Sequence, residues 1–109
     1  MSSIIDLTAI VTPRSGQTAR FLELFQKCAE AVAQEPGTLI YELRKGLPDK
    51  NGGKQQLVIR EVYADPAGQE AHMQSAAVKS MIAAIESGKL VENIDVIFTG
   101  SPIGARSKL

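Results

Sequence analysis

The sequence contains one cysteine, Cys28, and one histidine, His72, among its 109 residues. A single cysteine excludes a disulfide within the chain, and two such residues cannot form the Cys and His cluster that holds a zinc ion. A metal site would have to consist mostly of carboxylates, and no cluster of carboxylates stands out along the chain. We therefore expect no metal site.

Net charge and long apolar stretches are also lacking. Twelve basic residues balance twelve acidic ones, so the chain carries no excess positive charge for nucleic acid or an anionic membrane. No apolar run approaches the ~20 residues that cross a bilayer, and the first residues lack the basic start and apolar stretch of a signal peptide. We expect an intracellular protein with no nucleic-acid and no membrane partner.

The last three residues, Ser107, Lys108 and Leu109, match a peroxisomal address. In a eukaryotic source they predict a peroxisomal location and the peroxisomal import receptor as a partner. In a bacterial source the match is a coincidence, and the expected location is the cytoplasm.

Apolar periodicity predicts four strands and three helices in the order βαββααβ. The expected strands cover residues 4–11, 38–45, 56–63 and 91–98, and the expected helices cover residues 17–34, 66–73 and 76–86. Two βαβ-like halves of this kind form an α+β, ferredoxin-like fold, with a four-stranded antiparallel sheet and helices on one face. We expect one domain over residues 1–109, with a tail at residues 99–109.

Both faces of the predicted sheet carry apolar residues. On the first strand, Ile4 and Ile10 point to one side while Leu7 and Val11 point to the other. Helices can cover only one face, and an open apolar face favours association. A homodimer that packs sheet on sheet would cover it; alternatively, the tail and loops cover it.

Three segments carry a family resemblance: Glu35–Tyr41 (Glu-Pro-Gly-Thr-Leu-Ile-Tyr), Ile59–Pro66 (Ile-Arg-Glu-Val-Tyr-Ala-Asp-Pro) and Glu70–Ser75 (Glu-Ala-His-Met-Gln-Ser). They resemble the antibiotic biosynthesis monooxygenases, in particular the small quinol-monooxygenase-like members. The resemblance implies a dimeric α+β barrel that oxidises a small quinol-like or phenol-like aromatic substrate with molecular oxygen, without metal or organic cofactor. Other members are isomerases. A haem-degrading branch relies on a Trp, which this sequence lacks.

His72 is the expected catalytic base. Histidine both accepts and donates a proton near neutral pH, and oxygenation without a cofactor needs a substrate made electron-rich by deprotonation. Glu61 would hold the His72 ring and raise its basicity, although a structural, salt-bridged carboxylate is an equal alternative. Where relatives often carry a second histidine, this chain has Ala76 and Ala77, which argues against a two-histidine mechanism.

Tyr41, Tyr63 and Thr8 are the expected substrate-binding residues, with two core tyrosines as the alternative. Cys28 lies in the apolar stripe of the first helix and is expected to be a core residue. Three functions stay open: a cofactor-free monooxygenase, a non-oxidative isomerase on the same scaffold, and a dimeric binding module in which His72 points outward.

Overall fold

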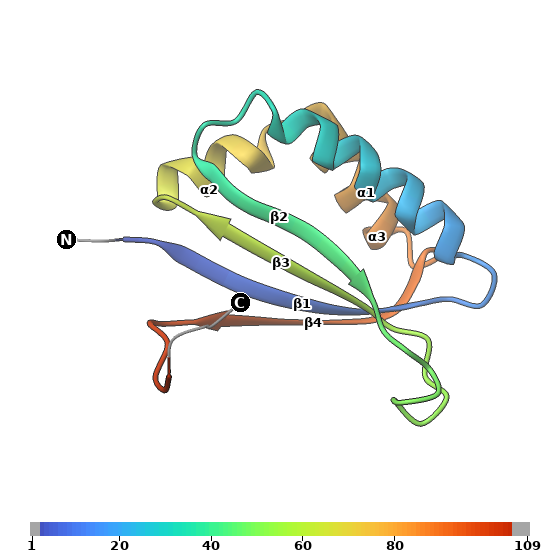
Figure 1. Ribbon diagram of the computed structural model, residues 1–109. Helices are drawn as coiled ribbons and strands as arrows, with labels where there is room; N and C mark the ends of the chain where they lie inside the picture. Colours follow the sequence, from blue (N-terminus) through green and yellow to red (C-terminus); the bar gives the residue numbers. More distant parts are fainter. Residues whose placement is uncertain (1–2, 106–109) are drawn as a thin grey trace.

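The computed structural model describes residues 3–105 (Figure 1). The tripeptide at residues 107–109, which matches a peroxisomal address, lies outside the described residues. The elements are β1 (Ile5–Pro13), α1 (Thr18–Val32), β2 (Thr38–Lys45), β3 (Leu57–Tyr63), α2 (Pro66–Met73), α3 (Ala76–Glu86) and β4 (Val91–Thr99). The predicted order is confirmed, and each boundary falls within about two residues of the predicted one.

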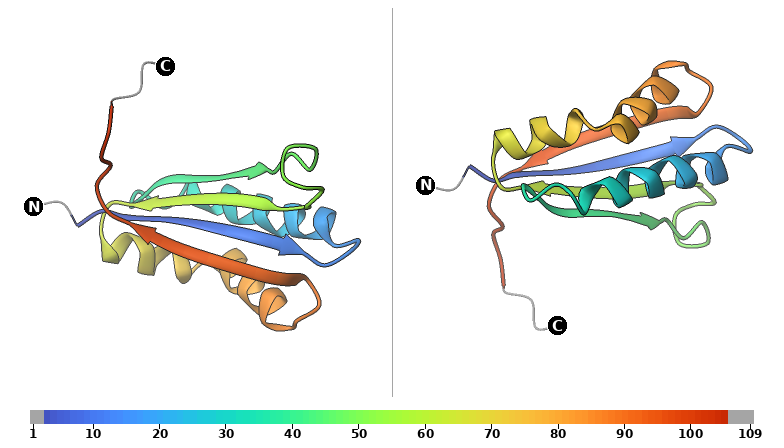
Figure 2. Two further views of the ribbon diagram at one scale, coloured as in Figure 1. Left: turned by 90° about the horizontal axis from the view of Figure 1, so that it is seen from below. Right: turned by 90° about the horizontal axis from the view of Figure 1, so that it is seen from above.

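The four strands form one antiparallel sheet in the order β2-β3-β1-β4. All three helices cover the same face of this sheet (Figure 1). Seen from above in Figure 2, α1 lies over the β2–β3 half and α3 over the β4 half. The α+β, ferredoxin-like prediction is therefore confirmed.

Local signals in the sequence start two of the helices. At α2, the Asp65 carboxylate accepts a hydrogen bond from the Gly68 backbone N–H at 2.8 Å, and Pro66 occupies the first turn. At α3, the Ser75 hydroxyl accepts from the Val78 N–H at 3.2 Å. Helix α1 has no side-chain cap of this kind, so its formation depends on the burial of its apolar stripe.

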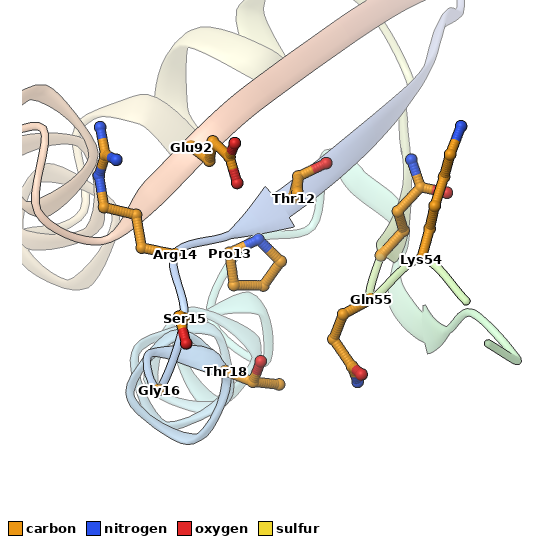
Figure 3. Close-up of a pocket in the computed structure, with 10 residues that line it drawn as sticks. Thr12, Pro13, Arg14, Ser15, Gly16, Thr18, Lys54, Gln55 and Glu92 are labelled. Atoms are coloured by element: carbon orange, nitrogen blue, oxygen red, sulfur yellow. The ribbon is translucent and has the colours of Figure 1, made fainter. Parts of the chain in front are cut away.

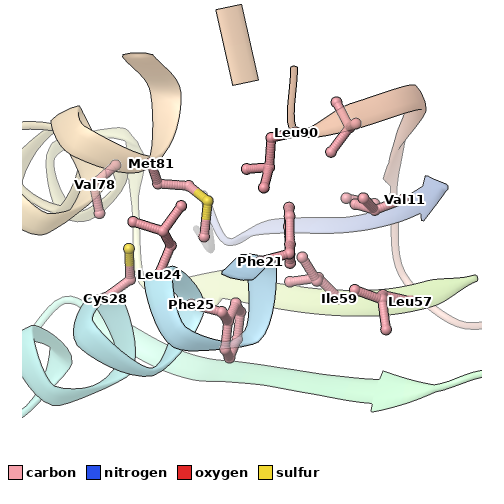
Figure 4. Packing of buried hydrophobic residues seen from close by; sticks show 12 residues of the cluster. Val11, Phe21, Leu24, Phe25, Cys28, Leu57, Ile59, Val78, Met81 and Leu90 are labelled. Carbon is pink, nitrogen blue, oxygen red and sulfur yellow. The ribbon is translucent and has the colours of Figure 1, made fainter. Parts of the chain in front are cut away.

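The core lies between the helices and the sheet (Figure 4). Leu7, Ala9 and Val11 of β1 point into it, because alternate residues of a strand face opposite sides. Phe21 and Cys28 of α1 pack against them from above and are 1% and 0% exposed. The predicted core position of Cys28 is confirmed.

The opposite face of the sheet is mixed rather than apolar. Arg60 pairs with Asp6 across two strands at 2.9 Å, and this ion pair alternates with partly exposed apolar side chains such as Ile10 and Val58. The start of the tail, residues 99–102, lines a pocket with Ile4 and Val62 on this face. Residues 99–102 are themselves exposed, so this contact lies at one end of the face and leaves most of the face open.

Strand β4 is the most exposed element of the sheet. Ile94, Val96 and Phe98 face the helix side, since they lie opposite Val11, Ala9 and Leu7 in the β1–β4 pairing. They remain 37%, 49% and 62% exposed. This apolar edge borders the cavity described next.

Candidate functional site

A cavity of about 290 Å³ lies between the helices and the sheet. All four strands and all three helices contribute to its wall, and most lining side chains are apolar. The lining residues are Leu7, Ala9, Phe21, Phe25, Cys28, Tyr41, Ile59, Glu61, Gln69, His72, Met73, Val78, Met81, Ile82, Ile85, Ile94, Val96 and Phe98. A few polar groups in an apolar hollow are typical of a small-molecule site.

His72, on α2, lines this cavity and is 2% exposed. Its Nδ1 lies 2.6 Å from Oε1 of Glu35. Its Nε2 has no hydrogen-bond partner among the described residues. The binding-module alternative required His72 to point outward, whereas the ring is buried against the cavity.

Glu35, rather than Glu61, holds the imidazole, and in this respect the sequence-based prediction is wrong. Glu61 accepts a hydrogen bond from the Tyr63 hydroxyl. Both residues lie on β3 two positions apart, so their side chains project from the same face of the strand. Glu61 still lines the cavity together with His72.

Two tyrosine rings contact the imidazole. The Tyr41 and His72 ring centres are 4.7 Å apart, and those of Tyr63 and His72 are 5.4 Å apart. Phe25 in turn stacks on Tyr41 with an interplanar angle of 3°. Contacts with two aromatic rings restrict the rotation of the His72 ring.

Burial raises the pKa of both tyrosines far above the ordinary value. For Tyr63, burial raises the pKa most, and the hydrogen bond to Glu61 adds to it. For Tyr41, burial is again the largest cause. Burial also raises the pKa of the Cys28 thiol. The three groups therefore stay protonated at neutral pH, and Tyr41 presents a neutral phenol at the cavity.

Thr8 does not belong to this site. It lies on the opposite face of the sheet, where it lines a separate hollow with Glu42, Arg44, Val58 and Arg60. The reason is strand alternation: its neighbours Leu7 and Ala9 face the helices. The prediction that Thr8 shares a substrate with Tyr41 is wrong.

Sequence reasoning did not assign roles to two polar residues of the site, Glu35 and Gln69. Gln69 lines the cavity one helical turn before His72, and the i, i+3 spacing places the two on one helix face. Glu35 stands in the Glu-Pro-Gly segment before β2. Because Glu35 lies 37 residues before His72, no local sequence pattern indicates that the two side chains meet.

A larger, polar hollow (Figure 3) shares no lining residue with the His72 cavity. Its volume is about 500 Å³, and exposed loop residues such as Arg14, Lys54 and Gln55 line it. Arg14 is already engaged, since its Nε donates to the Gly88 carbonyl. No buried titratable side chain faces this hollow among the residues that line it.

Within residues 3–105, no group of three or more His, Cys, Asp or Glu side chains is arranged to hold a metal ion. None of the helices in that range combines the length and the apolar character needed to cross a membrane.

The fold matches several solved structures over nearly its whole length. A Caulobacter crescentus protein described as a possible antibiotic biosynthesis monooxygenase is 20% identical, with 94% of this chain and 92% of that chain covered and a TM-score of 0.76. A counterpart from Nitrosomonas europaea is 16% identical, with 93% and 92% covered and a TM-score of 0.75. A Mycobacterium tuberculosis protein is 22% identical, with 96% and 100% covered and a TM-score of 0.76.

At these identities the structural likeness establishes the fold alone. No curated protein matches the chain. The sequence profile named antibiotic biosynthesis monooxygenase matches residues 6–84. This range includes nearly all of β1, the residues Glu35 and His72, and most of α3. The chain therefore belongs to the antibiotic biosynthesis monooxygenase family.

Proposed function

We propose that the protein is a cofactor-independent monooxygenase that oxidises a small quinol or phenol with molecular oxygen, and that His72 is its catalytic base. One observation carries the proposal: an apolar cavity contains a single imidazole whose Nδ1 is engaged and whose Nε2 is unpartnered. Such a nitrogen can accept a hydroxyl proton from a ring that occupies the cavity. The family assignment supports the same reaction class.

The proposed reaction converts a quinol and O2 into a hydroxyquinone and water. His72 Nε2 takes a hydroxyl proton, and the resulting anion passes one electron to O2. The substrate radical and superoxide then form a carbon–oxygen bond, and the His72 imidazolium returns its proton to the peroxide. The O–O bond breaks as the ring carbon loses its hydrogen and water leaves. One oxygen atom enters the ring, the other leaves as water, and the substrate supplies four electrons.

The cavity favours a neutral and small substrate. Of the described residues that line it, Glu61 is the one with a carboxylate and none is a lysine or an arginine. A carboxylated or phosphorylated ring would therefore be buried without a countercharge, which is costly. The volume of about 290 Å³ lies at the lower end of the range of roughly 300–1,000 Å³ for ligand pockets, which suits a monocyclic or bicyclic ring.

We also propose that the protein is a homodimer that packs through the sheet face opposite the helices. Ile97 is 53% exposed and Val58 is 36% exposed on this face. Burying such side chains against a second copy would contribute roughly 25 cal/mol for each Å² of apolar surface. This proposal is independent of the reaction.

Oxygen uptake tests the reaction. The full chain is mixed with naphthohydroquinone under air, with the autoxidation rate without protein subtracted, and the products are identified. We expect one O2 consumed for each hydroxynaphthoquinone formed. We expect His72→Ala to lower the rate by about 10²–10⁴-fold, the usual contribution of a general base.

The matched control is Glu70→Gln, an exposed position on the same helix, which is expected to keep the wild-type rate. No uptake above autoxidation with a panel of quinols and naphthols would overturn the proposal. Conversion of the substrate without oxygen would instead identify an isomerase.

A further inference from the structure

The second carboxylate of the site, Glu35, is nearly as deeply buried as the histidine it contacts. Its side chain is 9% exposed, and that of His72 is 2% exposed. Oε1 of Glu35 accepts from the Thr38 hydroxyl at 2.9 Å and lies 2.6 Å from His72 Nδ1. Oε2 is buried without a hydrogen-bond partner. Because this carboxylate has few partners, its bond to His72 is a large part of what compensates its burial.

The chemistry of the pair defines the proton positions on the ring. An ionised carboxylate can only accept hydrogen bonds. With an ionised carboxylate as the partner, a separation of 2.6 Å places the proton on Nδ1. A neutral imidazole carries one N–H, so Nε2 is left as an acceptor. Among residues 3–105, Glu35 Oε2 is the single side-chain N or O atom that is both fully buried and unpartnered. The unpartnered Nε2 must therefore keep access to the cavity.

The fold fixes Glu35 independently of the histidine. A Cβ placed on Gly37 would come 2.7 Å from Gly68 Cα, and one placed on Gly68 would come 2.8 Å from the Gly37 carbonyl oxygen. The start of β2 and the first turn of α2 therefore touch backbone to backbone. Glu35 lies two residues before this contact, and His72 lies one helical turn after it. Ala64 N–H also donates to the Gly37 carbonyl at 2.9 Å.

We propose that Glu35 is a positioning residue, which holds His72 in the Nδ1–H tautomer so that Nε2 faces the cavity as a proton acceptor. When Nε2 takes a proton, the adjacent carboxylate also balances the charge of the imidazolium, in the manner of a base oriented by a third group. This inference rests on the proposed function for its catalytic meaning. The tautomer itself can be measured without any substrate.

Nitrogen-15 NMR of the imidazole tests the proposal, and because the chain has one histidine, the signals need no assignment. In the neutral ring of the wild-type protein we expect a protonated Nδ1 and an unprotonated Nε2. In Glu35→Ala we expect the Nε2–H form to predominate, as in free histidine. The control is Glu30→Ala, which removes an exposed carboxylate of α1 and is expected to leave both tautomer and oxygen uptake unchanged.

Ligand binding gives a second readout. Unprotonated Nε2 accepts a hydrogen bond from naphthol but not from methoxynaphthalene. We expect the wild-type protein to bind naphthol about tenfold more tightly than methoxynaphthalene, a difference that corresponds to about one hydrogen bond. We expect Glu35→Ala to bind the two ligands about equally. A wild-type Nε2–H tautomer, measurable even if Glu35→Ala does not fold, would overturn the proposal. So would a folded Glu35→Ala with an unchanged tautomer. Absence of oxygen uptake with the expected tautomer would refute the proposed function alone.

Discussion

At the scale of residues, the site combines a base, a carboxylate partner and two phenols that stay neutral. The rings of Tyr41 and Tyr63 both contact His72, and burial raises the pKa values of both phenols. A neutral phenol can donate a hydrogen bond, whereas a phenolate cannot. In the proposed reaction, Tyr41 at the cavity wall can therefore donate to the substrate oxygen that becomes anionic.

The raised pKa values predict a loss of stability at alkaline pH. In the unfolded chain the tyrosines ionise near a pKa of about 10, whereas in the folded protein they keep their protons. Above about pH 10 the unfolded state therefore binds fewer protons, so the free energy of unfolding falls as pH rises, by up to about 1.4 kcal/mol per pH unit for each tyrosine. Urea unfolding between about pH 9 and pH 11 measures this slope.

The control is Tyr63→Phe, in which one of the chain's two tyrosines no longer contributes to the slope. The chain has no tryptophan, so its near-ultraviolet absorbance reports tyrosine directly. We expect tyrosinate absorbance to rise together with unfolding. Its appearance in the folded protein near the ordinary tyrosine pKa would contradict the prediction.

At the scale of elements, the sequence predicts the pieces well but predicts the contact between α2 and the start of β2 poorly. Asp65-Pro66 and Ser75 mark the starts of α2 and α3. These starts can be predicted because a cap bonds to the backbone within the next three residues, so the whole signal lies in a short stretch of sequence. The wrong placement of Thr8 in the substrate site was avoidable, because alternation along β1 already puts Thr8 on the sheet face opposite Leu7 and Ala9. The Glu35–His72 bond could not be predicted in this way, since two glycines from different elements bring the residues together.

Gly68→Ala tests this backbone contact. In a helix, alanine is normally more stable than glycine by about 1 kcal/mol. Here the new Cβ would come 2.8 Å from the carbonyl oxygen of Gly37, and backbone cannot move aside as a flexible side chain can. We expect the clash to prevail and to lower the free energy of unfolding by about 1–3 kcal/mol, measured by urea unfolding.

Gly100→Ala is the matched control, because a Cβ at Gly100 meets nothing within 4 Å. Its effect should stay within about 0.5 kcal/mol. If the Gly68→Ala protein is folded at working temperature, its His72 ring should also show more of the Nε2–H tautomer. A Gly68→Ala protein as stable as the wild type would show that the two segments can separate at little cost.

At the scale of the whole molecule, the two faces of the sheet differ in what covers them. The helices and the apolar core cover one face, whereas the start of the tail only lines a hollow at one end of the other. Alternation of apolar residues predicted the first face well, because its residues are mostly apolar. It overestimated the apolar character of the second, where Asp6, Arg60 and Glu42 lie among isoleucines and valines.

The proposed homodimer makes this second face an interface. Sedimentation velocity should give a mass near twice the chain's 11.7 kDa, with monomer appearing on dilution. Ile97→Glu should shift the protein toward monomer, because it places a charge at an apolar position of the proposed interface and, by symmetry, another from the second copy.

Ile103→Glu provides the comparison, since Ile103 is fully exposed at the surface of the tail and the same charge is added to the same residue type. If the dimer instead forms through the edge strand β4, Phe98→Glu would dissociate it and Ile97→Glu would not, since the two side chains point to opposite sides of the sheet. A wild-type monomer at all concentrations would exclude the dimer.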